Sequence, residues 1–361
     1  MSDAVAVAAY GLPTTHEIRG GPFDDDDFRA LTSKCEQHRL LGFLAATVRG
    51  EHVAVTGEQH EQFETQYAGW LAHDVRLEQM LLRALASLAE ASIRSRVFKG
   101  VALAHTVYDD PATRVFADVD LLVPSSDFLR SVAVLGDALG AERQQPELRP
   151  GFDERFGKEA MVRTPDGLEL DLHRTFVDGA YGLTVALDQL FGPPYRFPLG
   201  KYELETLPMP ARFLQACYAA ALGDWPPRLV SLRDVAQLVL RERPNLVDVL
   251  LAAREWQCEA VVARAVTAAW EQLAITELPP IVEWARRYEP TRRDRFLLAS
   301  HTGPARSFTR HAAAIVVIPD MAMRLEYLRA VAWPQRSYLA ARSMTPVEHA
   351  SRAMKRLVRR S

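Results

Sequence analysis

The sequence predicts an α+β protein in which a small mixed sheet lies between two helical regions. Helical periodicity dominates residues 1–92 and 207–361, whereas residues 93–206 alternate between short apolar strands, helices and a hairpin turn. With 361 residues, the chain is long enough for two or three structural units around sizeable cores. We therefore expect an N-terminal helical region (1–92), an α/β core (93–206) and a C-terminal helical domain (207–361).

Composition and charge exclude several classes of protein. The 43 basic and 46 acidic side chains leave a formal net charge of −3, which argues against long nucleic acid as a partner. Apolar stretches such as residues 312–318 are too short to span a bilayer, and the N-terminus lacks the pattern of a secretion signal. Cys35, Cys217 and Cys258 are widely separated and have no metal-ligand spacing. These features predict a cytoplasmic protein without a membrane span.

The N-terminal region carries two patterns that predict helices. Four aspartates at 24–27 predict a solvated helix start, because negative charge is favourable near the positive end of the helix dipole. Between residues 57 and 91, apolar side chains recur at three- and four-residue steps, which predicts a long amphipathic helix. The recurring residues, which we expect in the core, are Phe63, Tyr67, Trp70, Leu77, Leu81, Leu85 and Leu88.

The central region predicts the elements of the α/β core. A strand over 96–98 ends at Lys99-Gly100 and precedes a helix over 101–108. A buried strand over 115–123 is followed by a helix that ends at Gly140. Two segments of alternating polarity flank the turn sequence Pro-Asp-Gly at 165–167, which predicts a β-hairpin over 160–163 and 168–173.

The C-terminal region is predicted to be helical throughout. Its expected helices span residues 213–222, 229–240, 246–256, 259–273, 281–288 and 321–332. A basic tail over 352–360 is expected to be a solvated helix end, with contact to phosphate or a membrane as the alternative.

The carboxylates of the central strand carry the chemistry. Asp118 and Asp120 are two residues apart in the expected strand, so they share one face and repel each other. A divalent cation such as Mg²⁺ relieves that repulsion and keeps sites for phosphate. If the hairpin lies beside this strand, Asp171 completes a three-carboxylate site, which can hold two metals. A solvent-facing strand is the alternative explanation of the Asp-x-Asp pattern, and we expect His173 to be a hydrogen-bonded structural histidine rather than a ligand.

Lys99-Gly100 strengthens this interpretation. Glycine between a strand and a helix lets backbone amides approach a phosphate closely. Lys99 adds a positive charge for a triphosphate, although a lysine that extends into solvent from a strand end is the plain alternative.

These motifs together resemble a known family. The chain has Phe-Lys-Gly-Val-Ala-Leu over 98–103, Tyr-Asp-Asp-Pro over 108–111, Asp-Val-Asp-Leu-Leu-Val over 118–123 and Leu-Asp-Leu-His over 170–173. This set is similar to the uncharacterised bacterial nucleotidyltransferase family of the polymerase-beta nucleotidyltransferase superfamily. The resemblance covers residues 93–240 well and the final helices loosely.

The resemblance implies a role for each matching residue. Asp118 and Asp120 are the implied metal-binding pair, and Asp171 the implied third carboxylate, which helps to activate the acceptor hydroxyl. Lys99 and Gly100 stand where the superfamily has a Gly-Ser phosphate loop, which implies nucleotide binding.

Three further positions complete the comparison with the family pattern. Arg114 matches the family arginine, which implies phosphate contact, with a structural ion pair as the alternative. Asp234 matches too, and we expect it to pack between helices rather than to bind a ligand. Ala219 departs from the pattern, because the family commonly has a histidine two residues after Cys217.

The predicted function is metal-dependent transfer of a nucleoside monophosphate. An acceptor hydroxyl or phosphate attacks a nucleoside triphosphate, expected to be ATP, and pyrophosphate leaves; Mg²⁺ or Mn²⁺ is the implied cofactor. The acceptor is a small molecule, a peptide or a protein. Two alternatives stay open: a metal-dependent nucleotide-sugar glycosyltransferase, which also uses Asp-x-Asp, and a catalytically idle binding or regulatory module, which the loss of histidine at Ala219 would suit.

Overall fold

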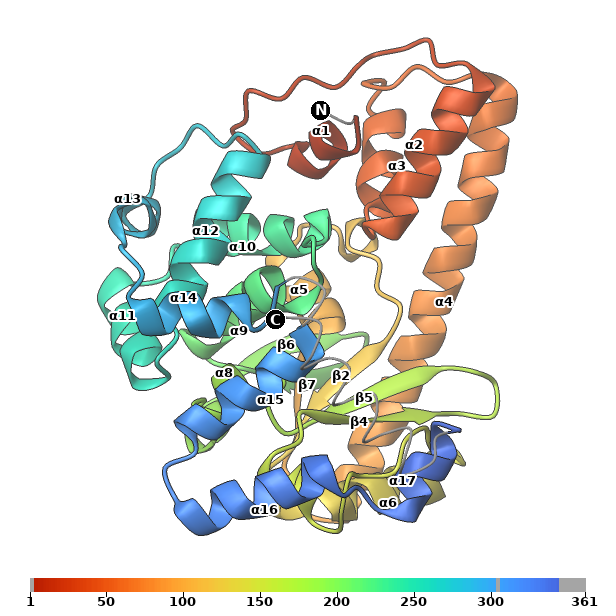
Figure 1. Ribbon diagram of the computed structural model, residues 1–361. Coiled ribbons are helices and arrows are strands. Elements are labelled where there is room, and N and C mark those ends of the chain that lie inside the picture. The colour runs from red at the N-terminus through yellow and green to blue at the C-terminus, as the bar shows by residue number, and fades with distance from the viewer. Residues whose placement is uncertain (1–2, 303–305, 344–361) are drawn as a thin grey trace.

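The computed structural model describes residues 3–302 and 306–343 (Figure 1). Within these residues one mixed sheet has seven strands in the order β3-β4-β5-β2-β1-β7-β6, and helices surround it. The strands are β1 (Arg96–Phe98), β2 (Val119–Leu122), β3 (Glu142–Arg143), β4 (Glu159–Arg163), β5 (Glu169–His173), β6 (Tyr195–Leu199) and β7 (Tyr202–Thr206). The α+β class expected from the sequence is confirmed.

The centre of the sheet pairs strands that are distant in sequence. β2 lies antiparallel to β1 and parallel to β5, and Asp120 is directly opposite Asp171 in the parallel pair. β4 and β5 form the predicted hairpin, in which the N–H of Gly167 donates to the carbonyl of Thr164 at 2.9 Å. A second hairpin of β6 and β7, which the sequence interpretation missed, extends the sheet beyond β1.

The central strand is shorter than expected. The predicted strand over 115–123 is paired only at β2, because the preceding backbone hydrogen-bonds elsewhere: the N–H of Phe116 donates to Asp74 Oδ1 at 3.2 Å. Asp118 therefore lies just before the strand rather than within it.

The two faces of the sheet differ sharply in polarity. One face carries fully buried Val97, Leu121, Leu170 and Leu172, and it packs against α4 (Gly57–Glu90) and α6 (Phe128–Leu139). Side chains alternate along a strand, so the neighbouring positions point to the opposite face. That face, which we call the acidic face, carries Asp120, Asp171, His173, Glu159 and Met161.

The N-terminal helices are α1 (Asp3–Ala9), α2 (Asp25–Gln37), α3 (Leu41–Arg49) and α4. Asp24 caps α2 by accepting a hydrogen bond from the N–H of Asp27 at 2.7 Å, which confirms the predicted helix start. Thr56 and Gln59 form a reciprocal capping box at the start of α4, the long helix expected over 57–91. Figure 1 shows α4 running along one side of the molecule from α2 to α6.

The remaining helices lie after β1, and most follow the sheet. Four short or medium helices belong to the central region: α5 (Gly100–Val107), α6, α7 (Phe152–Arg155) and α8 (Ala180–Leu183). Nine follow β7: α9 (Ala211–Tyr218), α10 (Leu229–Glu242), α11 (Leu246–Glu255), α12 (Glu259–Gln272), α13 (Pro280–Arg287), α14 (Arg292–Ala299), α15 (Arg306–Val317), α16 (Met321–Ala332) and α17 (Arg336–Ala341). Of these nine described helices, α14, α15 and α17 were not predicted. The basic tail over 352–360 lies outside the described residues.

Helices from both ends of the chain share a core. Residues of α1, α2 and α3 belong to the same buried cluster as residues of α9, α10 and α12. The region boundaries at 92/93 and 206/207 stay predictions, and this shared core joins the two flanking regions in space. The three cysteines are buried in this core as free thiols.

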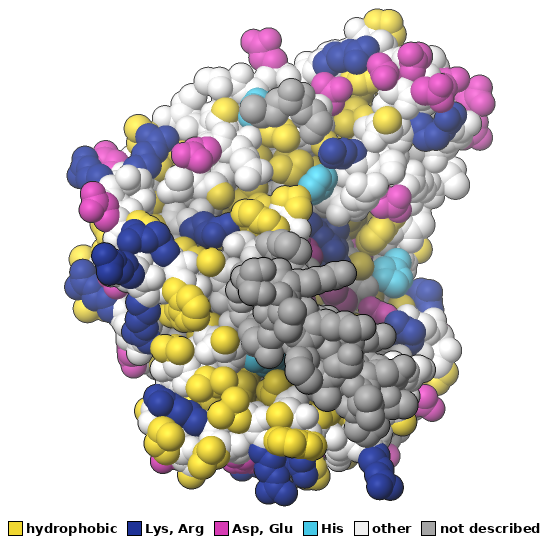
Figure 2. Space-filling view, viewed as in Figure 1, with side chains coloured by type: hydrophobic (Ala, Val, Ile, Leu, Met, Phe, Trp, Pro, Cys, Tyr) yellow, Lys and Arg dark blue, Asp and Glu magenta, His cyan; other side chains and the backbone are white. Residues whose placement is uncertain are grey.

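The surface has two distinct areas (Figure 2). Acidic side chains gather over the start of α2, and apolar side chains gather over α16, where Met321, Leu325 and Leu328 are exposed. Among the described residues, no helix is both long and apolar enough to cross a membrane.

Candidate functional site

The junction between β1 and α5 brings a lysine to the acidic face. Lys99 has a φ of 54°, a left-handed backbone conformation that residues with side chains adopt rarely and that concentrates at functional sites. Its ammonium forms an ion pair with Asp120 and lies 3.2 Å from Nε2 of His173. Gly100 follows because a Cβ there would lie 2.8 Å from Cβ of Phe116. The first N–H groups of α5 have no partner within the helix, so they form a potential phosphate-binding end.

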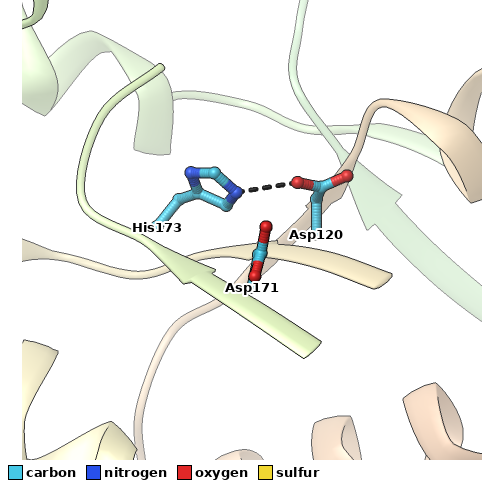
Figure 3. A group of neighbouring side chains, drawn as sticks. All are labelled: Asp120, Asp171 and His173. Carbon is cyan, nitrogen blue, oxygen red and sulfur yellow. Dashed lines mark hydrogen bonds and ion pairs between the residues drawn. The ribbon is translucent and has the colours of Figure 1, made fainter. Parts of the chain in front are cut away.

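Two strands bring the acids together beside this lysine. Asp120 on β2 and Asp171 on β5 lie opposite each other, and His173 is two residues further along β5 (Figure 3). Nε2 of His173 lies 2.7 Å from Oδ1 of Asp120. One possible ligand atom from each of the three residues lies within 4.8 Å of the others, so the group can hold a metal ion.

Asp171 is the clearest sign that a cation belongs here. Its Oδ1 is buried and has no hydrogen-bond partner in the structure. Burial, together with the nearby Glu159 and Asp120 carboxylates, raises the pKa of Asp171 to about 7. A buried, unpaired carboxylate oxygen is costly, and a divalent cation bound to it would remove that cost. The oxygen-rich donor set fits Mg²⁺ or Mn²⁺.

The His173 ring is uncharged, so one of its nitrogens can act as a metal ligand. The ring is fully buried, and burial, reinforced by the charge on Lys99, lowers its pKa well below the usual value. Nδ1 lies 3.3 Å from the carbonyl oxygen of Thr175 and Nε2 lies 2.7 Å from Oδ1 of Asp120, so a neutral ring donates its single N–H to one of these two oxygens. The Lys99 ammonium contacts Asp120 and His173, two of the three residues that can hold a metal ion.

Asp118 is not one of the three residues of this group. It forms an ion pair with Arg39, whose Nη1 and Nη2 lie 3.3 and 3.5 Å from the two carboxylate oxygens. Arg39 follows α2 with a φ of 58°. The group able to hold a metal therefore contains Asp120 and Asp171 but has His173 where the sequence led us to expect Asp118.

Arg114 and Asp234 form an ion pair with each other, and neither belongs to the group of Asp120, Asp171 and His173. Nε of Arg114 donates to Oδ1 of Asp234 at 3.0 Å, Nη2 donates to Oδ2 at 2.9 Å, and Nη1 donates to the carbonyl of Val115. Tyr108 Oη adds a fourth bond to Asp234 at 2.7 Å. Both charged side chains are only 6% exposed, so Arg114 is held in a buried ion pair, and its contact with phosphate stays a prediction.

Sequence reasoning missed Glu159 and Arg39. Glu159 Oε2 lies 3.4 Å from Nδ1 of His173 and 2.5 Å from the ammonium of Lys158. Counting outward from the hairpin turn would have placed Glu159 opposite His173, because antiparallel register is fixed by the turn. Arg39 is 79 residues from Asp118 and gave no local signal.

Ala219, the departure from the family pattern, begins a π-helical turn, Ala219–Gly223, directly after α9. A π-helical turn widens an α-helix locally, and such turns are frequent at functional sites. The structure therefore places Ala219 at an irregular point of a helix that packs in the shared core.

The fold and the site define a nucleotidyltransferase-type α+β protein: a mixed sheet with paired acids on adjacent strands and a lysine-glycine junction beside them. The sequence profile of a family described as "Uncharacterised nucleotidyltransferase" matches residues 24–273, and the chain belongs to this family of enzymes. The solution structure of the antibiotic-resistance factor ANT(2'')-Ia is similar to part of the chain, with 17% identity and a TM-score of 0.35. That similarity covers 51% of this chain and 89% of that chain. A search of curated proteins gave no match.

Proposed function

We propose that the enzyme transfers a nucleoside monophosphate from a nucleoside triphosphate, expected to be ATP, to an acceptor hydroxyl or phosphate, with release of pyrophosphate. The observation that carries this proposal is the meeting of Asp120, Asp171 and Lys99 on one face of the sheet, with a buried carboxylate oxygen left unpaired. Such a site supplies both the negative ligands for a cation and a positive group for phosphate.

In this proposal Asp120, Asp171 and His173 bind Mg²⁺ or Mn²⁺, and Asp118 joins them when its contact with Arg39 opens. The bound metal neutralises charge on the triphosphate and lowers the pKa of the acceptor hydroxyl. Asp171 is the residue assigned to the acceptor side, because its buried Oδ1 has no hydrogen-bond partner, whereas Asp120 is already paired with Lys99.

The positive groups of the site hold the triphosphate in the same proposal. With a metal ion bound to Asp120, the Lys99 ammonium would be available to bind phosphate oxygens beside the N–H groups at Gly100. Arg39 provides a planar guanidinium suited to two phosphate oxygens once it leaves Asp118. For Arg114 we propose that it holds the segment before β2 in place, since its donors are already bonded to Asp234 and to the carbonyl of Val115. A cytoplasmic location remains our expectation.

The test combines triphosphate binding with transfer of a label. The double variant Asp118→Asn, Asp120→Asn should lose metal-dependent ATP binding, measured by calorimetry with Mg²⁺ and then Mn²⁺, while its circular dichroism stays unchanged. Asp137→Asn, at an exposed position of α6, is the matched control and should bind as the parent does. Equal affinity in the double variant and the parent would show that this pair is not the site.

Incubation with α-labelled triphosphate, metal and cell extract identifies the reaction. Label in an acceptor product supports nucleotidyl transfer. Transfer of sugar from a nucleotide sugar would instead support the glycosyltransferase alternative, and triphosphate binding with no product in any extract would favour an idle binding module.

A further inference from the structure

A cavity lies beside the acidic group, between the sheet and the C-terminal helices. Its volume is about 370 Å³. Glu159 and Met161 of β4 line one side, and Tyr327 of α16 and Tyr338 of α17 line another. Cavities of about 300–1,000 Å³ are the usual size for small-molecule sites. The space therefore suits a small ligand rather than a macromolecule.

The cavity is on the acidic face, one strand away from the predicted catalytic carboxylate. Met161 is directly opposite Asp171 in the β4–β5 pair, and Glu159 is opposite His173. Directly opposite residues share a face of the sheet and have Cβ atoms about 5 Å apart. A ligand resting on Met161 consequently has its near end next to Asp171, where the acceptor group of a transfer reaction has to be.

The charges of the cavity compensate one another. Its lining has four acidic and four basic side chains, and three opposite pairs form ion pairs within it. These pairs are Arg143–Asp153, Lys158–Glu159 and Arg310–Asp178. The described residues that line the cavity therefore offer a polyanion such as a triphosphate no excess of positive charge, which favours a ligand whose net charge is near zero.

One wall of the cavity is aromatic. Phe152, Phe156 and Tyr327 pack with ring centroids 5.3–5.7 Å apart, and the hydroxyl of Tyr327 lies 2.8 Å from Nδ1 of His311. Tyr338 adds a half-buried ring, with the Arg342 guanidinium 4.8 Å from its centroid. Aromatic walls with a few polar tips bind ligands that have a ring of their own.

We propose that this cavity binds the acceptor, and that the acceptor is a small molecule of near-zero net charge that carries a hydroxyl on a ring. This inference rests on the transfer reaction proposed above and names its acceptor class. The family profile ends at residue 273, whereas α15, α16 and α17 begin at residue 306. Tyr327 and Tyr338, the aromatic lining residues that these helices supply, therefore belong to the part of the chain outside the family match, whereas Phe152 and Phe156 lie within it.

The test measures the NMR signal of the Met161 methyl group, which lies in the cavity. The chain has eight methionines, and ¹³C-methyl labelling with a Met161→Leu variant identifies the Met161 resonance. Four ring alcohols of near-zero net charge are titrated: 4-hydroxybenzyl alcohol, tyrosine, myo-inositol and methyl glucoside. At least one should shift the Met161 methyl saturably and leave Met80, which is buried under the opposite face of the sheet, unchanged.

Two variants and a matched control make the test specific. Tyr338→Ala should weaken that binding by about two- to tenfold, the range expected for one lost ring contact. Tyr202→Ala removes an exposed tyrosine of β7 and should have no effect. If Tyr338→Ala disturbs α17, Gln145→Ala, which removes the acceptor of the 2.7 Å hydrogen bond from Arg342, replaces it and should likewise weaken binding.

The outcomes separate this inference from the proposed function. Three results would each overturn the acceptor assignment. The first is the absence of any saturable Met161 shift, and the second is an affinity for the ring alcohols in both cavity variants equal to that of the parent. The third is a larger Met161 response to tripolyphosphate than to the ring alcohols. Asp171→Asn should keep ring-alcohol binding. Ring-alcohol binding without label transfer by the parent would therefore contradict the transfer reaction while leaving the cavity a ring-binding site.

Discussion

Two buried ionic groups lie close to the same sheet, and they differ in whether their hydrogen bonds are complete. In the Arg114–Asp234 group, the carboxylate receives bonds from Arg114 and from Tyr108, and the third guanidinium nitrogen donates to a carbonyl. Burial alone would lower the pKa of Arg114, but the carboxylate of Asp234 raises it overall. This group is complete without a ligand.

The group around Asp120 and Asp171 is incomplete. Acids outnumber the cations that touch them, Asp171 Oδ1 has no partner, and Lys99 is shared between Asp120 and His173. The comparison shows that a buried charged residue does not by itself indicate a functional site. A better indication is a buried polar atom without a hydrogen-bond partner, beside a charged side chain whose place a bound ion could take.

The largest expected effect comes from a substitution that removes the counterion of Arg114 in the Arg114–Asp234 group. Asp234→Asn keeps the shape of the side chain but leaves the buried Arg114 charge without its counterion, which should lower the free energy of unfolding by about 3–5 kcal/mol. Urea unfolding measures this. The same substitution at Asp171 should cost less than about 1 kcal/mol in the metal-free protein, because it removes a carboxylate that burial disfavours. Equal losses in the two variants would remove the distinction between the groups.

The next effect concerns chemistry rather than folding. Asp171→Asn should reduce turnover by on the order of a hundredfold or more and keep ATP affinity within a few-fold of the parent, because the role proposed for Asp171 is on the acceptor side. Calorimetry and a label-transfer assay on the same preparation measure the two quantities. Unchanged turnover would exclude Asp171 from the mechanism.

The smallest effect concerns Asp74, a buried acid with fewer hydrogen bonds than Asp234. Asp74 on α4 is buried and accepts one hydrogen bond, from the N–H of Phe116. Burial, with Glu78 nearby, raises its pKa to about 8. Between pH 4 and pH 8 the folded protein keeps a proton here that the unfolded chain has lost, so this residue makes stability fall as the pH rises through that window.

Asp74→Asn keeps the hydrogen bond and removes the titration. Between pH 5 and pH 6.5 the parent should lose on the order of 2 kcal/mol more unfolding free energy than the variant does. Unfolding series at several pH values provide the comparison, with Asp137→Asn as a control that should follow the parent. Parallel curves for the parent and Asp74→Asn would show that Asp74 is already ionised at low pH.

The sequence was informative where neighbours in the chain decide the structure. The α2 cap, the long helix α4 and the β4–β5 hairpin depend on local patterns, and all three were predicted. The alternation in β5 placed Asp171 and His173 on one face. The β6–β7 hairpin was missed although both of its strands alternate, as Tyr-Arg-Phe-Pro-Leu and Tyr-Glu-Leu-Glu-Thr, around a turn at Gly200.

Contacts between distant segments could not be predicted in the same way. Whether Arg114 faces a phosphate or Asp234 depends on where α10 packs, and the position of Arg39 depends on the packing of α2 and α3. Asp118 was assigned to the strand, but Asp74 of another helix binds the preceding backbone and ends the strand before it. Side-chain partners from other elements decided each of these cases.

The continuity of α4 has a mechanical consequence. Its 34 residues make a rod about 50 Å long, with Phe63 and Tyr67 fixed in the core shared by the flanking helices and Leu77 and Leu81 fixed under the sheet. A rod anchored at both ends leaves no joint between the parts it connects, because bending it would break hydrogen bonds in the helix interior. The N-terminal helices and the sheet thus form one rigid frame. Arg39 follows α2 in that frame, so in the proposed reaction its guanidinium would approach a phosphate by turning its own side chain rather than by a movement of the helices.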